Sequence, residues 1–143
     1  MARRSEGTMA RVLLVDDDPA FGKAAVERLA ADGHHVTFNP GAFGALAAVC
    51  GAAYDLVLID VLMPGMDGTK LIEYMPRRKL GGAQVLLVSS IAEGRLCDLA
   101  ATYGADGHFC KRDGLDQLCN LVRHRTQTPT PHGRRAEPRG TGP

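Results

Sequence analysis

The sequence lacks the features that would point to a membrane, to nucleic acid or to a disulfide or zinc scaffold. No apolar run approaches the roughly 20 residues of a membrane span; the uncharged segment Gly41–Tyr54 is rich in glycine and alanine and too short. Lys plus Arg number 17 and Asp plus Glu 16, and this net charge of +1 gives no reason to expect direct nucleic acid binding. The four cysteines show neither CxxC spacing nor a Cys/His cluster, so we expect them to be reduced.

An export signal is also missing. Two arginines near the start, Arg3 and Arg4, are followed only by the short apolar run Val12–Val15, which stops at three aspartates. A secretory signal needs a longer apolar segment. We therefore expect a cytoplasmic protein.

What is present is the composition of one globular domain: 143 residues, 45% hydrophobic and 23% charged. The stretch after Arg125 holds four prolines and no aliphatic residue larger than alanine, so it cannot offset the entropy of ordering. The first ten residues look equally unstructured. We predict a disordered N-terminal extension at 1–10, one folded domain at 11–125, and a disordered tail rich in proline and arginine at 126–143.

Within 11–125, short apolar runs alternate with segments of helical periodicity. The runs predict five strands, at 12–15, 35–38, 56–59, 85–88 and 108–110. The periodic segments predict helices around Phe21–Leu29, 42–50, 67–75, Leu96–Tyr103 and Leu115–Val122. The alternation indicates an α/β fold, a doubly wound five-stranded parallel sheet in the flavodoxin-like order 2-1-3-4-5 with helices on both faces.

Polar residues follow these strands at the carboxyl edge of the sheet, where such folds bind ligands. Asp16 and Asp17 follow the first strand, Asp60 the third, Ser89 the fourth and Lys111 the fifth. Converging carboxylates repel one another, and a hard divalent cation such as Mg²⁺ relieves that repulsion. A carboxylate, a metal, a hydroxyl and a lysine are the groups needed for phosphoryl transfer to an aspartate.

Four segments in this order carry a resemblance to a known family: VLLVDDDP, DLVLIDVLMPGMDG, VLLVSS and GADGHFCK. They are similar to the receiver domain of CheY-like response regulators, and the similarity covers essentially all of 11–125. DVLMPGMDG is a specific signature. The resemblance implies a single-domain response regulator of a two-component system or phosphorelay, which accepts a phosphoryl group and signals by protein–protein contact.

The resemblance also implies the metal and phosphate sites. Asp60 would be the phosphoacceptor, and it would ligate Mg²⁺ together with Asp17 and the backbone carbonyl of Leu62. Asp16 would act on the metal through water. Lys111 would pair with the phosphoryl group.

The switch positions follow in the same way. Ser89 takes the hydroxyl position; Ser90 competes for it, but the register from Lys111 favours Ser89. His108 takes the position of the aromatic switch residue. The resemblance implies that a sensor histidine kinase or a histidine-phosphotransfer protein donates the phosphoryl group. A downstream protein would then bind the face of the fourth helix, fifth strand and fifth helix, roughly residues 92–122.

Two positions depart from the family pattern. The lysine is normally followed by a proline across a cis peptide, but here Arg112 follows Lys111. A cis bond to a residue other than proline costs about 2.5–4 kcal/mol, so we predict a trans bond and a rerouted 111–114 loop. Leu62 and Ile91 place apolar side chains where a hydrolytic water must approach, and we expect slow loss of the phosphoryl group.

Two alternative functions remain open. Asp16-x-Asp18 after a buried strand resembles the nucleophile motif of haloacid-dehalogenase-type phosphatases. That family usually has threonine or valine four residues after the first aspartate, where this chain has Ala20, and it leaves Asp60 unexplained. The missing proline after Lys111 motivates the second alternative, a receiver-like scaffold that is not phosphorylated. On the main interpretation, the chain is no enzyme beyond catalysing its own aspartyl phosphorylation and dephosphorylation.

Overall fold

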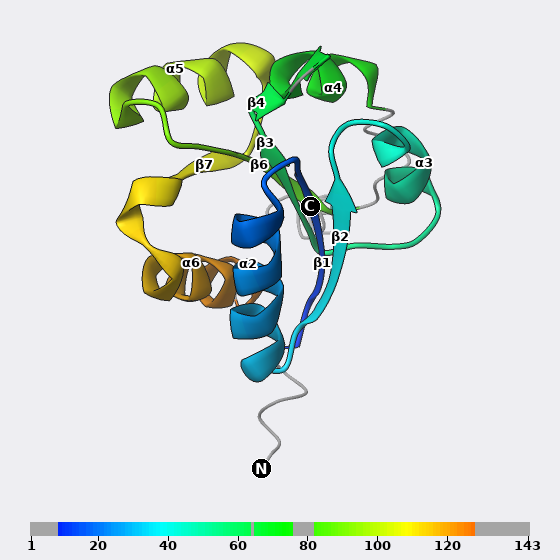
Figure 1. Cartoon of the computed structure of the whole chain (residues 1–143), viewed down its shortest axis with the longest axis vertical. Coiled ribbons are helices and arrows are strands. Elements are labelled where there is room, and N and C mark those ends of the chain that lie inside the picture. The colour runs from blue at the N-terminus through cyan, green and yellow to red at the C-terminus, as the bar shows by residue number, and fades with distance from the viewer. Residues whose placement is uncertain (1–8, 64, 76–81, 128–143) are drawn as a thin grey trace, which may run out of the picture.

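The computed structural model describes residues 9–63, 65–75 and 82–127, which form a parallel sheet covered by helices on both faces (Figure 1). The sheet has five strands in the order β2-β1-β3-β6-β7, and every neighbouring pair is parallel. This order confirms the predicted flavodoxin-like arrangement. The strands are β1 (Arg11–Asp16), β2 (His35–Pro40), β3 (Leu56–Asp60), β6 (Gln84–Ser89) and β7 (Gly107–Cys110).

The helices connect the strands and cover both faces of the sheet. Helices α2 and α6 lie side by side on one face, and α4 and α5 lie together on the other, with α3 beside β2 (Figure 1). Their bounds are α2 (Pro19–Ala31), α3 (Ala45–Cys50), α4 (Gly68–Tyr74), α5 (Glu93–Tyr103) and α6 (Leu115–Gln127).

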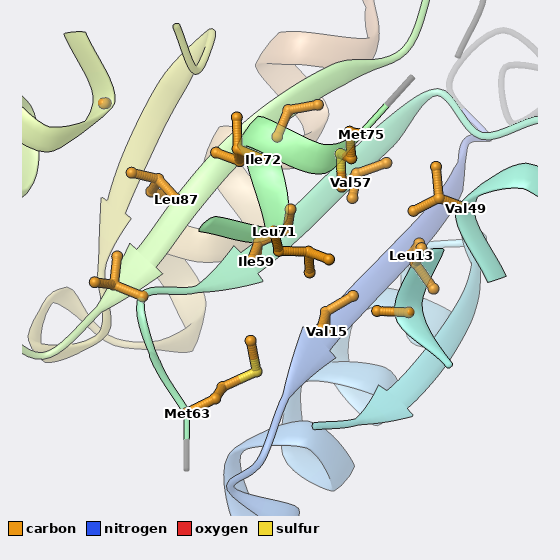
Figure 2. Close-up of a cluster of buried hydrophobic side chains, with 14 of the residues drawn as sticks. Leu13, Val15, Val49, Val57, Ile59, Met63, Leu71, Ile72, Met75 and Leu87 are labelled. Atoms are coloured by element: carbon orange, nitrogen blue, oxygen red, sulfur yellow. The ribbon is translucent and has the colours of Figure 1, made fainter. Parts of the chain in front are cut away.

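Alternate residues of the buried strands separate the core into two layers. Figure 2 shows the layer beneath α3, α4 and α5, in which Leu13 and Val15 of β1 and Ile59 of β3 meet Leu71 of α4 and Val49 of α3. The other layer contains the intervening strand residues together with apolar residues of α2 and α6. Strands with both faces covered explain the continuous apolar runs of the sequence.

Two local features differ from the sequence-based prediction. Helix α3 begins at Ala45 and not at residue 42, because Gly44 has a φ of 79°, a left-handed conformation that a helix does not contain. A short antiparallel pair that the sequence did not reveal, β4 (Leu62–Met63) and β5 (Met66–Asp67), follows β3. Gly65 lies between these two strands with a φ of 80°, as expected in a tight turn.

The predicted domain limits are slightly too narrow. Helix α6 continues to Gln127, and the Thr126 hydroxyl donates to the carbonyl of Val122, so residues 126 and 127 are helical and not part of a tail. Ala10 is buried. Residues 1–8 and 128–143, where we predicted disorder, lie outside the described residues. Among the helices that the structure describes, none combines the length and apolar character needed to cross a bilayer.

Side chains and backbone groups tie the elements together at the amino edge of the sheet, where the strands begin. Nδ1 of buried His34 accepts a hydrogen bond from the Ala10 N–H, 3.0 Å away. Across the sheet, the Arg125 guanidinium of α6 donates to Oε1 of Gln84 at 2.7 Å, and Asp106 accepts from the N–H of Val85 at 2.8 Å. These contacts fix both ends of the described chain to the start of the sheet.

His34 makes the stability of this edge dependent on pH. Burial lowers the pKa of the imidazole below its ordinary value, and protonation would remove the acceptor that Ala10 uses. The unfolded chain takes up this proton near pH 6.5 and the folded chain resists it, so the contribution of His34 is present above that pH and lost as the pH falls below it. We expect His34→Asn, whose amide oxygen can still accept from Ala10, to remove this dependence.

Urea unfolding followed by circular dichroism between pH 5 and pH 8 measures the effect. The gap in urea midpoint between wild type and His34→Asn should be smaller at pH 5 than at pH 8. His35→Asn, a change at the adjacent exposed histidine, serves as the control. A gap that stays constant over this range would show that His34 does not titrate with a lowered pKa.

Candidate functional site

Three carboxylates meet where β1 and β3 end. One oxygen each from Asp16, Asp17 and Asp60 lies within 4.8 Å of the others. The strands are hydrogen-bonded neighbours, with Val15 beside Ile59, so the residues that follow reach the same edge. Asp16 is 0% exposed and Asp60 4%, whereas Asp17 is exposed. The convergence predicted from the sequence is present in the structure.

The turn after β1 is fixed by the aspartates themselves. The Asp18 N–H donates to Oδ1 of Asp16 at 2.9 Å, and Oδ1 of Asp18 accepts from the N–H groups of Ala20 and Phe21 at 3.1 and 3.2 Å. Asp18 is therefore the N-cap of α2, with Pro19 at the first helical position, as its residue type and place predict. This cap sets the direction of the chain as it leaves the site.

The backbone beside Asp60 is supported by Gly68, the first residue of α4. The N–H of Gly68 donates to the carbonyl of Val61 at 2.8 Å, and a Cβ at Gly68 would overlap the carbonyl oxygen of Asp60. The Leu62 N–H donates to Oδ1 of Asp60, 3.3 Å away. The glycine that ends the DVLMPGMDG motif thus allows α4 to start directly against the backbone of Asp60.

Lys111 completes the charged cluster from the end of β7. Its Nζ lies 2.8 Å from Oδ2 of Asp16 and 3.8 Å from Oδ2 of Asp60, and its side chain is 14% exposed. No described peptide bond is cis, so the Lys111–Arg112 bond is trans, as predicted. The chain continues as the 3₁₀ turn η2 (Lys111–Asp113).

Ser89 and His108, the two residues for which the sequence predicts switch roles, have different surroundings. Ser89 ends β6 at 1% exposure, and its Oγ accepts from the Ile91 N–H at 3.2 Å. It is next to Cys110 in the register of β6 and β7, so it shares the edge at which Lys111 follows. The partner of His108 is Glu93: the ring Nε2 lies 2.9 Å from Oε2 of this carboxylate at the start of α5. His108 therefore links β7 to α5, and this contact does not include the three aspartates.

Burial and like charge shape the electrostatics of the site. The pKa of Asp60 is raised to about 7, first because burial disfavours its charged form and then because Asp16 lies close by; Lys111 acts in the opposite direction. Oδ2 of Asp16 has the Lys111 ammonium as a charge partner, but no hydrogen-bond donor of acceptable geometry among the described residues.

This donor set fits a hard divalent cation. It consists of carboxylate oxygens only, one of them buried without a hydrogen bond, and the exposed Asp17 leaves a side open to solvent. Mg²⁺ is held in proteins by one or two carboxylates together with waters and phosphate oxygens. The arrangement therefore brings a buried carboxylate, an acidic cluster that fits a divalent cation and an ammonium group within a few ångströms of one another.

Three residues near this site make contacts that the sequence pattern does not predict. Phe21 fits the apolar period of its helix, and that pattern predicts a core residue; in the structure its ring lies under the ammonium of Lys111. Glu93, the partner of His108, shows no distinguishing pattern. Gly68 belongs to the recognisable motif, but its contact with Asp60 depends on where α4 begins. All three contacts depend on how the fold brings separate segments together, so residue type alone does not predict them.

Comparison with known proteins gives consistent results. The family model of the response regulator receiver domain matches residues 12–123. The transcriptional regulatory protein TcrA of Mycobacterium tuberculosis is 33% identical over 115 residues, which are 79% of this chain and 44% of TcrA. The transcriptional activator protein PfeR of Pseudomonas aeruginosa is 32% identical over 76% of this chain and 35% of its own length. This chain therefore spans less than half the length of these two relatives.

Solved structures show the same fold. The chemotaxis response regulator CheY4 of Vibrio cholerae matches with a TM-score of 0.75 at 24% identity, over 82% of this chain and 99% of the other. The response regulator TrrA of Thermotoga maritima, solved in complex with Mg²⁺ and BeF, matches with a TM-score of 0.69 at 27% identity, over 80% of this chain and 97% of TrrA.

The contact between Gly68 and Asp60 leads to a stability prediction. We expect Gly68→Ala to lower the free energy of unfolding by about 1–3 kcal/mol, because the new Cβ must displace backbone next to Asp60. The matched control is Gly94→Ala in the first turn of α5, where a Cβ meets nothing within 4 Å. That change should be neutral or stabilising by up to about 1 kcal/mol. Urea unfolding measures both, and equal stability of the two variants would refute the contact.

Proposed function

Because the chain belongs to the response regulator receiver domain family, we propose that it accepts a phosphoryl group on Asp60 from a phosphohistidine of a sensor histidine kinase or a histidine-phosphotransfer protein. The observation that supports this proposal most directly is the cluster of three aspartates and Lys111 at the carboxyl edge of the sheet. The Asp60 carboxylate is within 4.8 Å of Asp16 and Asp17 and 3.8 Å from the Lys111 ammonium. The family is one of phosphoryl-accepting regulators and not of conventional enzymes.

In the transfer, an oxygen of the Asp60 carboxylate attacks phosphorus and the bond from phosphorus to the donor's imidazole nitrogen breaks. The imidazole nitrogen leaves with the electron pair, and a proton on the other nitrogen of the donor's ring makes the departing group a neutral imidazole. Asp60 must be ionised to attack, and Lys111 favours that form against the effects of burial and Asp16. Positioning and charge neutralisation are the protein's main contributions to such a step.

A Mg²⁺ ion is part of the proposal. Asp17, Asp60 and the backbone carbonyl of Leu62 would hold it, and Asp16 would act through a bound water. When bound, the cation offsets the negative charge of the phosphoryl oxygens. Asp16 keeps its carboxylate oriented through the Asp18 N–H, and the ammonium of Lys111 is close enough to both buried carboxylates to turn toward a phosphoryl group on Asp60.

The response to phosphorylation would begin at Ser89. Its hydroxyl follows the strand next to β3, and a phosphoryl group on Asp60 offers it new acceptor oxygens. The 89–91 segment leads into α5, so a movement of Ser89 would shift the start of that helix, and His108 links α5 to β7 through Glu93. We propose that the face formed by α5, β7 and α6, roughly residues 92–122, then binds a downstream protein.

The central test compares wild type with Asp60→Asn. Each is incubated with acetyl phosphate, with and without Mg²⁺, and run on a phosphate-affinity gel. We expect a mobility shift in wild type only, and its loss when the metal is chelated. A wild-type chain that shows no shift with acetyl phosphate or a cognate kinase would favour the unphosphorylated scaffold. Turnover of a small phosphomonoester would favour the phosphatase alternative.

The lifetime of the phosphoryl group is a separate prediction. The exposed Leu62 side chain, 59% accessible, offers an approaching water no hydrogen bond. We expect Leu62→Asn to speed dephosphorylation roughly two- to tenfold, as one added hydrogen bond to that water would.

Loss of label from ³²P-labelled Asp60 over time measures the rate. Tyr74→Gln, a polar substitution at another exposed apolar residue, is the control and should decay like wild type. If Leu62→Asn also decays like wild type, the apolar side chain at 62 does not limit hydrolysis.

A further inference from the structure

Among the described residues, three side-chain groups lie close to the ammonium of Lys111. Two are the buried carboxylates of Asp16 and Asp60, at 2.8 and 3.8 Å. The third is the ring of Phe21, whose centroid lies 4.5 Å from Nζ. This distance is within the roughly 6 Å over which the face of an aromatic ring attracts a cation. With the side chain only 14% exposed, the ring takes a place that water would otherwise occupy.

The position of Phe21 follows from the same turn that forms the metal site. Asp18 caps α2, and its Oδ1 accepts from the Phe21 N–H, so Phe21 lies in the first turn of the helix. The ring is partly buried and packs against the core layer that Phe38 also joins. Phe38 in turn lies against Gly22, where a Cβ would overlap its ring. Phe21 is therefore positioned by its backbone hydrogen bond to Asp18 and by its packing against this core layer.

The Phe21 ring affects the site differently from a further carboxylate at the same place. Its face attracts the ammonium through the quadrupole, but it carries no net charge and so adds nothing to the repulsion between Asp16 and Asp60. It also binds no divalent cation in competition with the aspartates. It can retain Lys111 while the ammonium turns from Asp16 toward a group attached to Asp60.

We propose that Phe21 is a positioning residue for phosphoryl transfer: the face of its ring holds the ammonium of Lys111 between the buried carboxylates of Asp16 and Asp60. This inference rests on the proposed function, because it assigns Phe21 a part in the same reaction. Phe21 touches Lys111 and is not itself a catalytic residue.

The test compares one variant that removes the aromatic ring with two that keep the ring and change its substituents. Phe21 is replaced by Leu, by Tyr, and by 3,4,5-trifluorophenylalanine through site-specific incorporation, which weakens the negative face of the ring. The initial rate of Asp60 phosphorylation by acetyl phosphate with Mg²⁺ is measured for each. We expect Phe21→Leu to lower the rate roughly three- to tenfold, the trifluorinated chain to fall toward the Leu variant, and Phe21→Tyr to stay near wild type.

Phe38→Leu is the matched control, since it shortens a second partly buried phenylalanine of the same core layer. Its rate should remain within about twofold of wild type, while its loss of stability should resemble that of Phe21→Leu. Circular dichroism checks that every variant folds. A trifluorinated chain as fast as wild type would overturn the proposal, as would a Phe38→Leu variant as slow as Phe21→Leu.

A second measurement detects the contact between Phe21 and Lys111 independently of phosphorylation. The ε-methylene protons of Lys111 should show an upfield ring-current shift in the proton spectrum, present in wild type and lost in Phe21→Leu. Wild type with no such shift overturns the positioning role even if phosphorylation proceeds. Wild type that shows the shift but takes up no phosphoryl group overturns the proposed function and, with it, the role of Phe21 in transfer; the contact alone then stands.

Discussion

The close approach of two buried carboxylates, Asp16 and Asp60, is the constraint on which the rest of this structure depends. Burial disfavours the charged form of Asp60 and the nearby Asp16 carboxylate adds to this effect, so the pKa of Asp60 is raised to about 7. Three neighbouring groups offset the repulsion between the two carboxylates. The Asp18 N–H donates to Asp16, the Leu62 N–H donates to Asp60, and the ammonium of Lys111 faces both.

The sheet topology brings that pair together. Strand β1 is followed by α2 on one face, and its neighbour β3 leads through the β4–β5 hairpin to α4 on the other. Connections that depart in opposite directions from adjacent strands leave a crevice between them, and ligands bind there in open parallel sheets. The buried apolar residues of β1 and β3 fix the register, so the position of Asp16 relative to Asp60 is set by the core and not by the loops.

The sequence predicts the features that depend on local pattern. The five strands, their order and the convergence of Asp16, Asp17 and Asp60 follow from continuous apolar runs that end in polar residues, and the N-cap at Asp18 follows from residue type. The contacts between distant segments could not be predicted in this way. The ring of Phe21 beneath Lys111 and the pairing of His108 with Glu93 join residues far apart in the chain, and neither pair shows a periodic signal. The start of α3 was misplaced because a single left-handed glycine ends the turn before it.

The amino edge of the sheet has a practical consequence. Ala10 is anchored beside His34 at the start of β1 and β2, and Arg125 near the end of α6 is anchored to Gln84 at the start of β6. Both boundaries of the described fold are therefore on the side away from the three aspartates. A fluorophore, an affinity tag or a surface linker attached at either boundary would leave the acidic crevice unobstructed. Two such labels would sit on the same side of the molecule, a geometry suited to immobilising the protein with the three aspartates facing the solution.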